Sequence, residues 1–278
     1  MTKIVDARRA GLGDLVVGLW VLEGARFAGE AVGVMSGPYR PVAEAFGFAE
    51  AEEGEVLRVG GDSESYRLEM KSGPVGESRA RRWQTVLGWG FEPRRPELKE
   101  LPEEAVAWAR EEAAKRRGEK GLALVFPCAN YVSRTWPIDK WIRLAQHLQD
   151  EGWGTIALDQ HRSRVEAMPL FYHGFPLTHV MALMREADVV VGNDSGMAHL
   201  AGALGVRAVA VMGPTDGETV FGHDDRVTPI AATRDEAPCV GCHFQYGNGY
   251  RALCDAHGCD ALHTLPWMRV AKEVMGNE

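Results

Sequence analysis

Residues 187–214 read ADVVVGNDSGMAHLAGALGVRAVAVMGP, and this stretch decides the fold. The β-branched run at 189–191 predicts a short buried strand that ends at the following Gly-Asn. Asp194 or Ser195 then caps a helix rich in small residues, and Gly205 stops that helix. A second apolar run follows directly and predicts the next strand. The stretch therefore predicts a β-turn-α-β unit.

The turn in this unit lies where the carboxyl end of a strand meets the amino end of a helix. It contains Asp194, Ser195 and Gly196. Free backbone N–H groups and the positive end of the helix dipole favour an anionic ligand there. His199 follows Ser195 by four residues and so returns to the same helix face. A capped crossover helix with a partly buried histidine is the alternative interpretation, and the turn alone does not decide between the two.

Short strands alternate with helices along both halves of the chain. The pattern predicts strands at 4–7, 31–35, 55–59, 122–126, 155–158, 189–191 and 208–212, and helices from about 15 and at 103–117, 138–149 and 178–185. Residues 79–90 fit either one more helix or an ordered approach to the domain boundary. Such alternation is typical of parallel sheets with right-handed crossovers. We therefore expect an α/β fold of two Rossmann-like domains facing across a cleft, with ligands at the carboxyl ends of the strands.

The prolines within 91–102 suggest a linker or a braced loop between the two domains. We expect a small N-terminal domain over 1–118 and a C-terminal domain over 119–263, which includes the cysteine-rich segment 238–260. A C-terminal helix is expected over 264–278. At 278 residues the chain is long enough to bury the core of each domain.

Composition narrows the class of partner. The formal net charge of −8 argues against a nucleic-acid-binding protein, because phosphate contacts need a basic surface. The first residues lack a signal-peptide pattern, and the apolar run at 15–22 is shorter than the ~20 residues of a membrane span. We expect no transmembrane segment and a cytoplasmic location, with peripheral contact with the inner membrane left open.

Two motifs precede predicted helices. Gly11-Leu12-Gly13-Asp14 follows the first strand, but it lacks the third glycine of a dinucleotide fingerprint. Asp14 fits either a helix N-cap or a general base. In Ser133-Arg134-Thr135-Trp136-Pro137 the proline suits the first helical position. Arg134 fits either a solvated loop or a site that grips phosphate.

Four of the five cysteines lie close together in the sequence, in the pattern Cys239-x2-Cys242-x11-Cys254-x4-Cys259. Disulfides are rare in the cytoplasm, so the cluster predicts a closed, structural four-thiolate metal site within 238–260. Its chemistry favours zinc, and His243 and His257 are possible substitutes for one ligand. Cys128 lies apart and is expected to be a small buried residue.

The motif GNDSGMAHLA at 192–201, followed by ALGV at 203–206 and MGPTD at 212–216, resembles the ADP-heptose heptosyltransferases of glycosyltransferase family 9. The motifs at 11–14 and 133–137 fall in the same order along the chain as in this family. The resemblance covers most of the second half of the chain but only scattered points of the first half. It implies a GT-B type fold, with 1–118 as the acceptor-side domain and 119–263 as the nucleotide-sugar-binding domain. It also implies that a sugar is transferred with inversion, and ADP-heptose is the favoured donor. The acceptor hydroxyl belongs to a glycan, a lipid or a protein, and no catalytic metal is expected.

The resemblance also implies roles for individual residues. Asp14 becomes the general base and Arg134, where the family often has lysine, the cation that neutralises the leaving diphosphate. Asp159 takes the place of an acidic residue near the ribose. The residues expected to bind the donor are Gly13, Ser133, Arg134, Asp159, Asp194, Ser195, Gly196, His199, Met212 and Gly213. The short first domain departs from the family and leaves acceptor recognition open.

Cysteine-rich segments occur at this point in family 9, and in its autotransporter-modifying subgroup four cysteines hold iron. That analogy favours iron where thiolate chemistry alone favours zinc. Three other functions are left open: a sugar-nucleotide-binding module without turnover, a scaffold that uses the cysteine element for interactions, and an epimerase or hydrolase acting on a nucleotide sugar.

Overall fold

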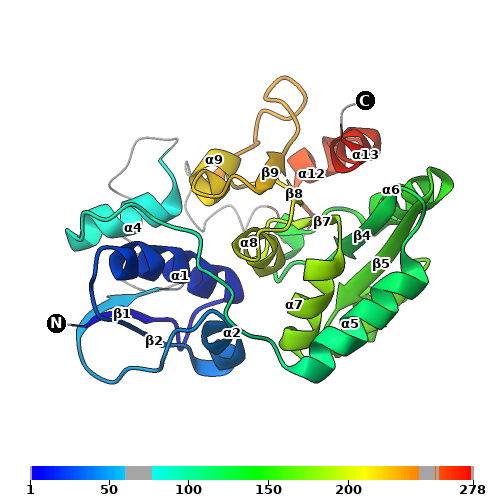
Figure 1. The fold of residues 1–278 in the computed structure, drawn as a ribbon. Coiled ribbons are helices and arrows are strands. Elements are labelled where there is room, and N and C mark those ends of the chain that lie inside the picture. The colour runs from blue at the N-terminus through cyan, green and yellow to red at the C-terminus, as the bar shows by residue number, and fades with distance from the viewer. Residues whose placement is uncertain (1, 60–76, 244–253, 255–256, 277–278) are drawn as a thin grey trace.

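The structure is a computed structural model that describes residues 2–59, 77–243, 254 and 257–276 (Figure 1). Two parallel sheets dominate it. The first has the strand order β2-β1-β3, with β1 at Lys3–Asp6, β2 at Val32–Met35 and β3 at Glu55–Arg58. The second has the order β6-β5-β4-β7-β8-β9, and neighbouring strands in both orders pair in parallel. An α/β fold with two parallel sheets is thus confirmed.

The strands of the second sheet are β4 at Gly121–Phe126, β5 at Trp153–Asp159, β6 at Phe171–His173, β7 at Val189–Asn193, β8 at Ala208–Val211 and β9 at Val227–Ile230. The helices are α1 at Leu12–Phe27, α2 at Arg40–Ala45, α4 at Arg79–Leu87, α5 at Glu103–Arg116, α6 at Ile138–Asp150, α7 at Leu177–Glu186, α8 at Gly196–Ala203, α9 at Gly217–Phe221, α12 at Asp260–Thr264 and α13 at Trp267–Met275. Short 3-10 turns lie at Gly37–Tyr39, Val132–Arg134 and Arg162–Arg164.

Both faces of the six-stranded sheet are covered. Every residue of β4 is buried, and its side chains alternate between two hydrophobic clusters as the strand period requires. Leu122 and Leu124 join the cluster that includes α7, α8 and α1. Ala123 and Val125 join the cluster built with α6 and α13. Because α1 shares a core with α8, the two sheets are joined by packed helices.

The segment between α4 and α5 crosses from the first sheet to the second without a helix or strand (Figure 1). It is braced: Arg94 donates its backbone N–H to the carbonyl of Trp20 at 3.1 Å, and Arg95 pairs with Asp224 at 3.3 Å. The helix α5 that follows packs against α7 and β5. It therefore covers the second sheet, although the expected range 1–118 placed it in the first domain.

Several predicted boundaries shift. The strand expected to end before Gly192 continues through Asn193, because both residues still pair with β8. The helix expected from about residue 15 begins at Leu12. Gly205 does stop α8, with a φ of +77° that suits glycine. Two short strands, β6 and β9, were not predicted.

Among the residues described, no helix is both long and apolar enough to cross a lipid bilayer.

Candidate active site

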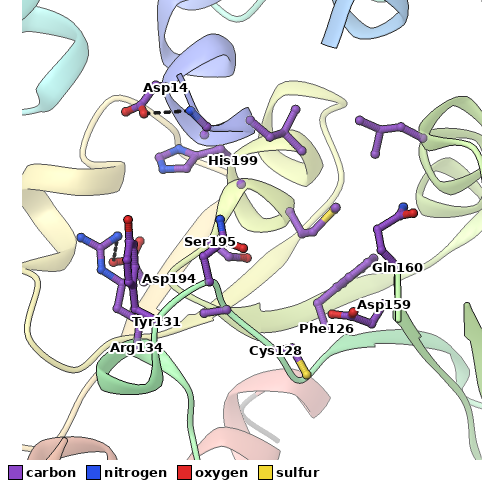
Figure 2. Close-up of a pocket in the computed structure, with 18 of the residues that line it drawn as sticks. Asp14, Phe126, Cys128, Tyr131, Arg134, Asp159, Gln160, Asp194, Ser195 and His199 are labelled. Atoms are coloured by element: carbon purple, nitrogen blue, oxygen red, sulfur yellow. Dashed lines mark hydrogen bonds and ion pairs between the residues drawn. The ribbon is translucent and has the colours of Figure 1, made fainter. Parts of the chain in front are cut away.

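A cavity of about 960 Å³ lies between the two sheets (Figure 2). Its walls come from the loop after β1 and the start of α1, from the loops after β4 and β5, and from the turn between β7 and α8. The carboxyl ends of strands from both sheets therefore face the same space, as expected for this class of fold.

Two helix amino termini meet at this cavity because two glycines are in contact. A Cβ atom on Gly196 would lie 2.8 Å from Cβ of Leu12 and 2.9 Å from the backbone nitrogen of Gly13. A Cβ atom on Gly13 would lie 3.0 Å from the ring of His199. No larger residue fits at Gly196 without moving α1. The close approach places the first turns of α1 and α8 on one cavity, where their positive dipole ends favour an anion.

Asp14 lies in the first turn of α1, at position N3, and lines the cavity. The N-cap is Gly11, so the expectation that Asp14 is itself the N-cap is wrong: the helix begins three residues earlier. One carboxylate oxygen accepts the N–H of Gly11 at 3.3 Å, and the other lies 2.7 Å from Nη2 of Arg79. Arg79 comes from α4, lines the same cavity and was not predicted from the sequence.

Asp194 is buried at the end of β7 and holds two partners. It accepts a hydrogen bond of 2.5 Å from the hydroxyl of Thr215, and Nη1 of Arg134 lies 3.4 Å away. Burial by itself raises the pKa of this carboxyl, but the charge of Arg134 and the bond from Thr215 outweigh burial and hold the pKa below its usual value. Asp194 is therefore an anion that orients Arg134 at the cavity wall (Figure 2).

Ser195 occupies the N-cap position of α8 in an extended conformation, with φ −150° and ψ 169°. Its side chain makes no capping hydrogen bond, and among the described residues its buried hydroxyl oxygen has no hydrogen-bond partner. The side chain of Asp194 does not cap the helix either. The sequence placed the helix start correctly, but the amino end of α8 faces the cavity without a side-chain cap.

His199 is buried and packs against Phe221, with ring centroids 4.4 Å apart and the rings tilted by 36°. Burial, followed by the charge of His223, lowers the pKa of His199 to about 3, against the opposing effect of Asp194. Burial also lowers the pKa of His223 to about 4. At neutral pH His199 is therefore an uncharged ring. It lines the cavity together with Ser195, as expected from their four-residue spacing on one helix face.

Asp159 and Cys128 lie at the far side of the cavity (Figure 2). Asp159 accepts the backbone N–H of His161 at 2.9 Å and lies 3.5 Å from Nε of Arg164. Cys128 is half-buried, donates its thiol to the carbonyl of Arg164 at 3.3 Å and has its pKa raised by burial. Cys128 was expected to be a small buried residue, whereas its side chain is only half-buried and lines the cavity.

Three of the residues expected to bind the donor do not line this cavity. Ser133 and Met212 are buried in the protein interior, at 0% and 1% exposure. Gly213 faces the other way: a Cβ atom there would lie 2.7 Å from Cγ of Leu262. The loop after β8 instead reaches the cavity through Thr215. The remaining expected residues, Gly13, Asp14, Arg134, Asp159, Asp194, Ser195, Gly196 and His199, all line it.

The four clustered cysteines lie behind the loop after β8. None is in a disulfide, and Cys242 and Cys259 are buried. Burial raises the pKa of both buried thiols, that of Cys259 to about 11, and the charges of Cys239 and Cys254 raise them further. The four sulfurs are therefore close enough to influence one another. Among the described residues, no three His, Cys, Asp or Glu side chains lie close enough together to hold a metal ion.

Two backbone hydrogen bonds join the segment of the clustered cysteines, called here the cysteine element, to the loop after β8. Gly241 donates to the carbonyl of Gly213 at 3.0 Å, and His243 donates to the carbonyl of Pro214 at 2.7 Å. His243 also lines the cavity, which the sequence did not predict. The element thus supports the loop that carries Thr215.

Comparison with known proteins identifies the family. The sequence matches the model of glycosyltransferase family 9 (heptosyltransferase) over residues 81–247, which is more than half of the chain. A search of curated proteins finds no match.

Solved structures share the fold at low sequence identity. The family 9 glycosyltransferase of Veillonella parvula is 16% identical, with a TM-score of 0.66 and coverage of 99% of this chain and 96% of that chain. The ADP-heptose LPS heptosyltransferase II of E. coli is 15% identical, with a TM-score of 0.62 and coverage of 98% and 97%. The iron-containing dodecameric glycosyltransferase TibC of enterotoxigenic E. coli is 13% identical, with a TM-score of 0.59 and coverage of 84% and 62%.

These neighbours have the two-domain GT-B arrangement that the sequence predicted, and they establish the fold. The family match covers the turn between β7 and α8 and the Arg134 loop, which form one wall of the cavity. The chain is therefore a glycosyltransferase and belongs to family 9, the heptosyltransferase family.

Proposed function

We propose that the protein transfers heptose from ADP-heptose to an acceptor hydroxyl with inversion at the anomeric carbon. The observation that carries this proposal is the contact between Gly13 and Gly196, which puts the carboxylate of Asp14 and the open amino end of α8 on one cavity. A base and an anion site are the two components that the reaction needs. The E. coli neighbours support the choice of donor, since one is an ADP-heptose heptosyltransferase and another was solved with ADP.

The diphosphate would lie against the amino end of α8. Backbone N–H groups of the first helical turn and the hydroxyl of Ser195 face the cavity there. Arg134 adds a cation, held in place by Asp194 at 3.4 Å. These groups are fixed before the donor binds, so they stabilise the charge that grows on the leaving diphosphate in the transition state.

The acceptor would enter from the side of Asp14. As the acceptor oxygen forms its bond to the anomeric carbon, its proton passes to the Asp14 carboxylate and the bond from that carbon to the diphosphate oxygen breaks. ADP leaves with the bonding electron pair. One displacement of this kind inverts the anomeric centre.

We further propose that Cys239, Cys242, Cys254 and Cys259 hold one zinc or iron ion as a structural brace. None of the four is in a disulfide, and the charges of Cys239 and Cys254 act on the thiols of Cys242 and Cys259. Thiolates are ligands that both metals accept, and four of them leave no open position for substrate. Binding would draw the sulfurs together and fix the element against Gly213 and Pro214. The iron-containing neighbour TibC supports iron as one choice.

A sugar-nucleotide-binding module without turnover is the second candidate. The observation that favours it is the small first sheet, in which the structure describes three strands where the second sheet has six. Such a module would bind ADP at α8 in the same way but would release no ADP from a donor.

Two measurements test the proposal. Melting shifts with ADP, UDP, GDP and CDP report the preferred nucleotide, because a ligand at 100 times its Kd stabilises by about 2.7 kcal/mol. ADP release from ADP-heptose then separates enzyme from binding module. Preference for ADP together with turnover supports the proposal. Preference for another nucleotide contradicts the donor, and ADP binding without turnover favours the module.

A further inference from the structure

Arg79 forms an ion pair with Asp14 that is largely shielded from solvent. Nη2 of Arg79 lies 2.7 Å from Oδ1 of Asp14, and the two side chains are only 16% and 19% exposed. Ion pairs in open solvent contribute little, but a shielded pair with this distance holds its geometry. Both residues line the cavity, and they come from different helices, α4 and α1.

The guanidinium of Arg79 also lies near an aromatic ring. Its central carbon lies 5.0 Å from the ring centroid of Trp83, one turn further along α4. Trp83 is buried, at 1% exposure, in the hydrophobic core that includes α1. A cation over a buried indole ring loses freedom to move. Arg79 therefore presents its charge to Asp14 from a fixed position.

Helix capping does not require this ion pair. Asp14 completes the first turn of α1 through its other oxygen, Oδ2, which accepts the N–H of Gly11. Oδ1 has no partner to satisfy in the helix, yet Arg79 holds it. The carboxylate is thereby fixed at both oxygens in one orientation at the cavity wall, where a capping role alone would leave Oδ1 free to turn.

The charge of Arg79 also reaches the opposite wall. It contributes to the lowered pKa of Asp194, His199 and His223, although it is not the largest cause at any of them. These groups surround the amino end of α8. The charge of Arg79 therefore acts on the groups around this turn as well as on the carboxylate of Asp14.

We propose that Arg79 is a positioning residue for Asp14: it fixes the carboxylate in the orientation in which Asp14 takes the acceptor proton. This inference rests on the proposed function, in which Asp14 is the general base. Arg79 keeps its own protons throughout. The acceptor proton moves to Asp14 while the acceptor oxygen bonds to the anomeric carbon and ADP departs.

A double-mutant cycle tests this role, with ADP-heptose as donor, water as acceptor and ADP release as the readout. Arg79→Met should lower kcat roughly 10- to 100-fold, as for loss of a residue that orients a reacting group. KM and the ADP affinity measured by calorimetry should stay within about twofold. Arg79→Lys should recover part of the rate, because it restores a cation without the guanidinium geometry.

The cycle is completed in the Asp14→Asn background. If Arg79 acts through Asp14, Arg79→Met should cause no further loss there, since the group that it orients is gone. Arg81→Met is the matched control: Arg81 also lies on α4, but its ion pair with Glu92 is exposed, at 60% and 75%. That variant should keep the wild-type rate.

Each other outcome contradicts a defined statement. An equal loss from Arg79→Met in both backgrounds overturns the positioning role while the proposed function stands. A loss of ADP affinity in folded Arg79→Met and Arg79→Lys also overturns it, because Arg79 would then bind the donor directly. Asp14→Asn with the wild-type rate of ADP release overturns the proposed general base and the inference together. Unfolding curves identify a variant that fails to fold, and Arg79→Lys then carries the test.

Discussion

The hydroxyl of Thr215 donates a 2.5 Å hydrogen bond to the carboxylate of Asp194, 21 positions earlier in the chain. Arg134 approaches the same carboxylate at 3.4 Å. The three residues follow β8, β7 and β4, which are neighbours in the six-stranded sheet. Their loops therefore meet at one edge of the sheet, and Asp194 is the anion that connects them.

Replacing Thr215 with valine should separate these loops. Valine has nearly the shape of threonine but offers no donor, so Asp194 loses one of its two partners. A hydrogen bond to a charged group contributes about 1.5–3 kcal/mol, and we expect Thr215→Val to lower the free energy of unfolding by about that amount. ADP affinity should also fall as Arg134 loses its fixed anion. Urea unfolding and calorimetry measure both effects. Thr215→Ser, which keeps the hydroxyl, should resemble the wild type, and equal behaviour of the two variants would contradict this role.

A negative charge at Ser195 should prevent nucleotide binding. The hydroxyl of Ser195 faces the position that we propose for the diphosphate, and an acidic residue at a helix start does not by itself harm the fold. We expect Ser195→Glu to weaken ADP binding at least ~100-fold, because like charges in an enclosed site cost several kcal/mol. Ser195→Gln has almost the same volume without the charge and should bind ADP more tightly than the Glu variant. Equal affinities would show that bulk rather than charge is responsible, and unchanged binding would place the diphosphate elsewhere.

The part of the site that follows from local pattern was predictable. The run of three valines, the Asp-Ser-Gly turn and Gly205 place β7, α8 and their open turn within two residues of their true bounds. This succeeds because burial of a parallel strand and the stop of a helix depend on neighbouring residues. The glycines at 13 and 196 were recognised by their motifs, whereas their contact depends on how α1 packs against α8.

Ion pairs between residues far apart in the sequence, and strands at the edges of a sheet, could not be predicted from local sequence patterns. Nothing in the run Arg79-Ala80-Arg81-Arg82 distinguishes the arginine that pairs with Asp14, because that choice depends on how α4 packs against α1. The strands β6 and β9 lie at the two edges of their sheet, and β9 contains Pro229. Proline is tolerated at an edge but reads as a strand breaker in the sequence.

The cysteine element gives a prediction that metal analysis can check. Purified protein should contain about one zinc or iron ion per chain, as a closed four-thiolate site requires. Cys259→Ser should lose the metal and loosen the element, since site formation is coupled to folding. Cys128→Ser is the control, because Cys128 lies against Arg164 at the cavity and should keep full metal content. Metal-free wild-type protein with four rapidly reacting thiols would contradict the site.

The buried histidines predict how stability depends on pH. Burial lowers the pKa of His199 to about 3 and that of His223 to about 4, both below the usual 6.5. As the pH falls below about 6.5, the unfolded chain binds protons that the folded chain does not, so the free energy of unfolding decreases. His199 alone should cost about 2 kcal/mol between pH 8 and pH 5. Asp224, whose pKa is raised by burial, acts in the opposite direction at lower pH.

Urea unfolding at pH 8, 6.5 and 5 measures this dependence in the wild type and in His199→Gln. The variant has no group to protonate at that position, so its curve should be flatter by about 2 kcal/mol between pH 8 and pH 5. The same slope in both proteins would show that His199 does not titrate differently in the folded and unfolded chains.

Asp14→Asn separates a structural role of Asp14 from a catalytic one. The carbonyl oxygen of asparagine can still accept the N–H of Gly11, so the first turn of α1 should remain intact. The amide cannot take the acceptor proton. We expect near-wild-type ADP affinity and a transfer rate lower by roughly 10²–10⁴-fold, the usual contribution of general acid–base catalysis. Asp14→Ala is the less informative change, because it removes the hydrogen bond to the N–H of Gly11 together with the proposed base. ADP release from ADP-heptose measures the rate, and calorimetry with ADP measures the affinity. Together they distinguish the two roles. A variant that binds ADP and transfers at the wild-type rate would show that another group accepts the proton.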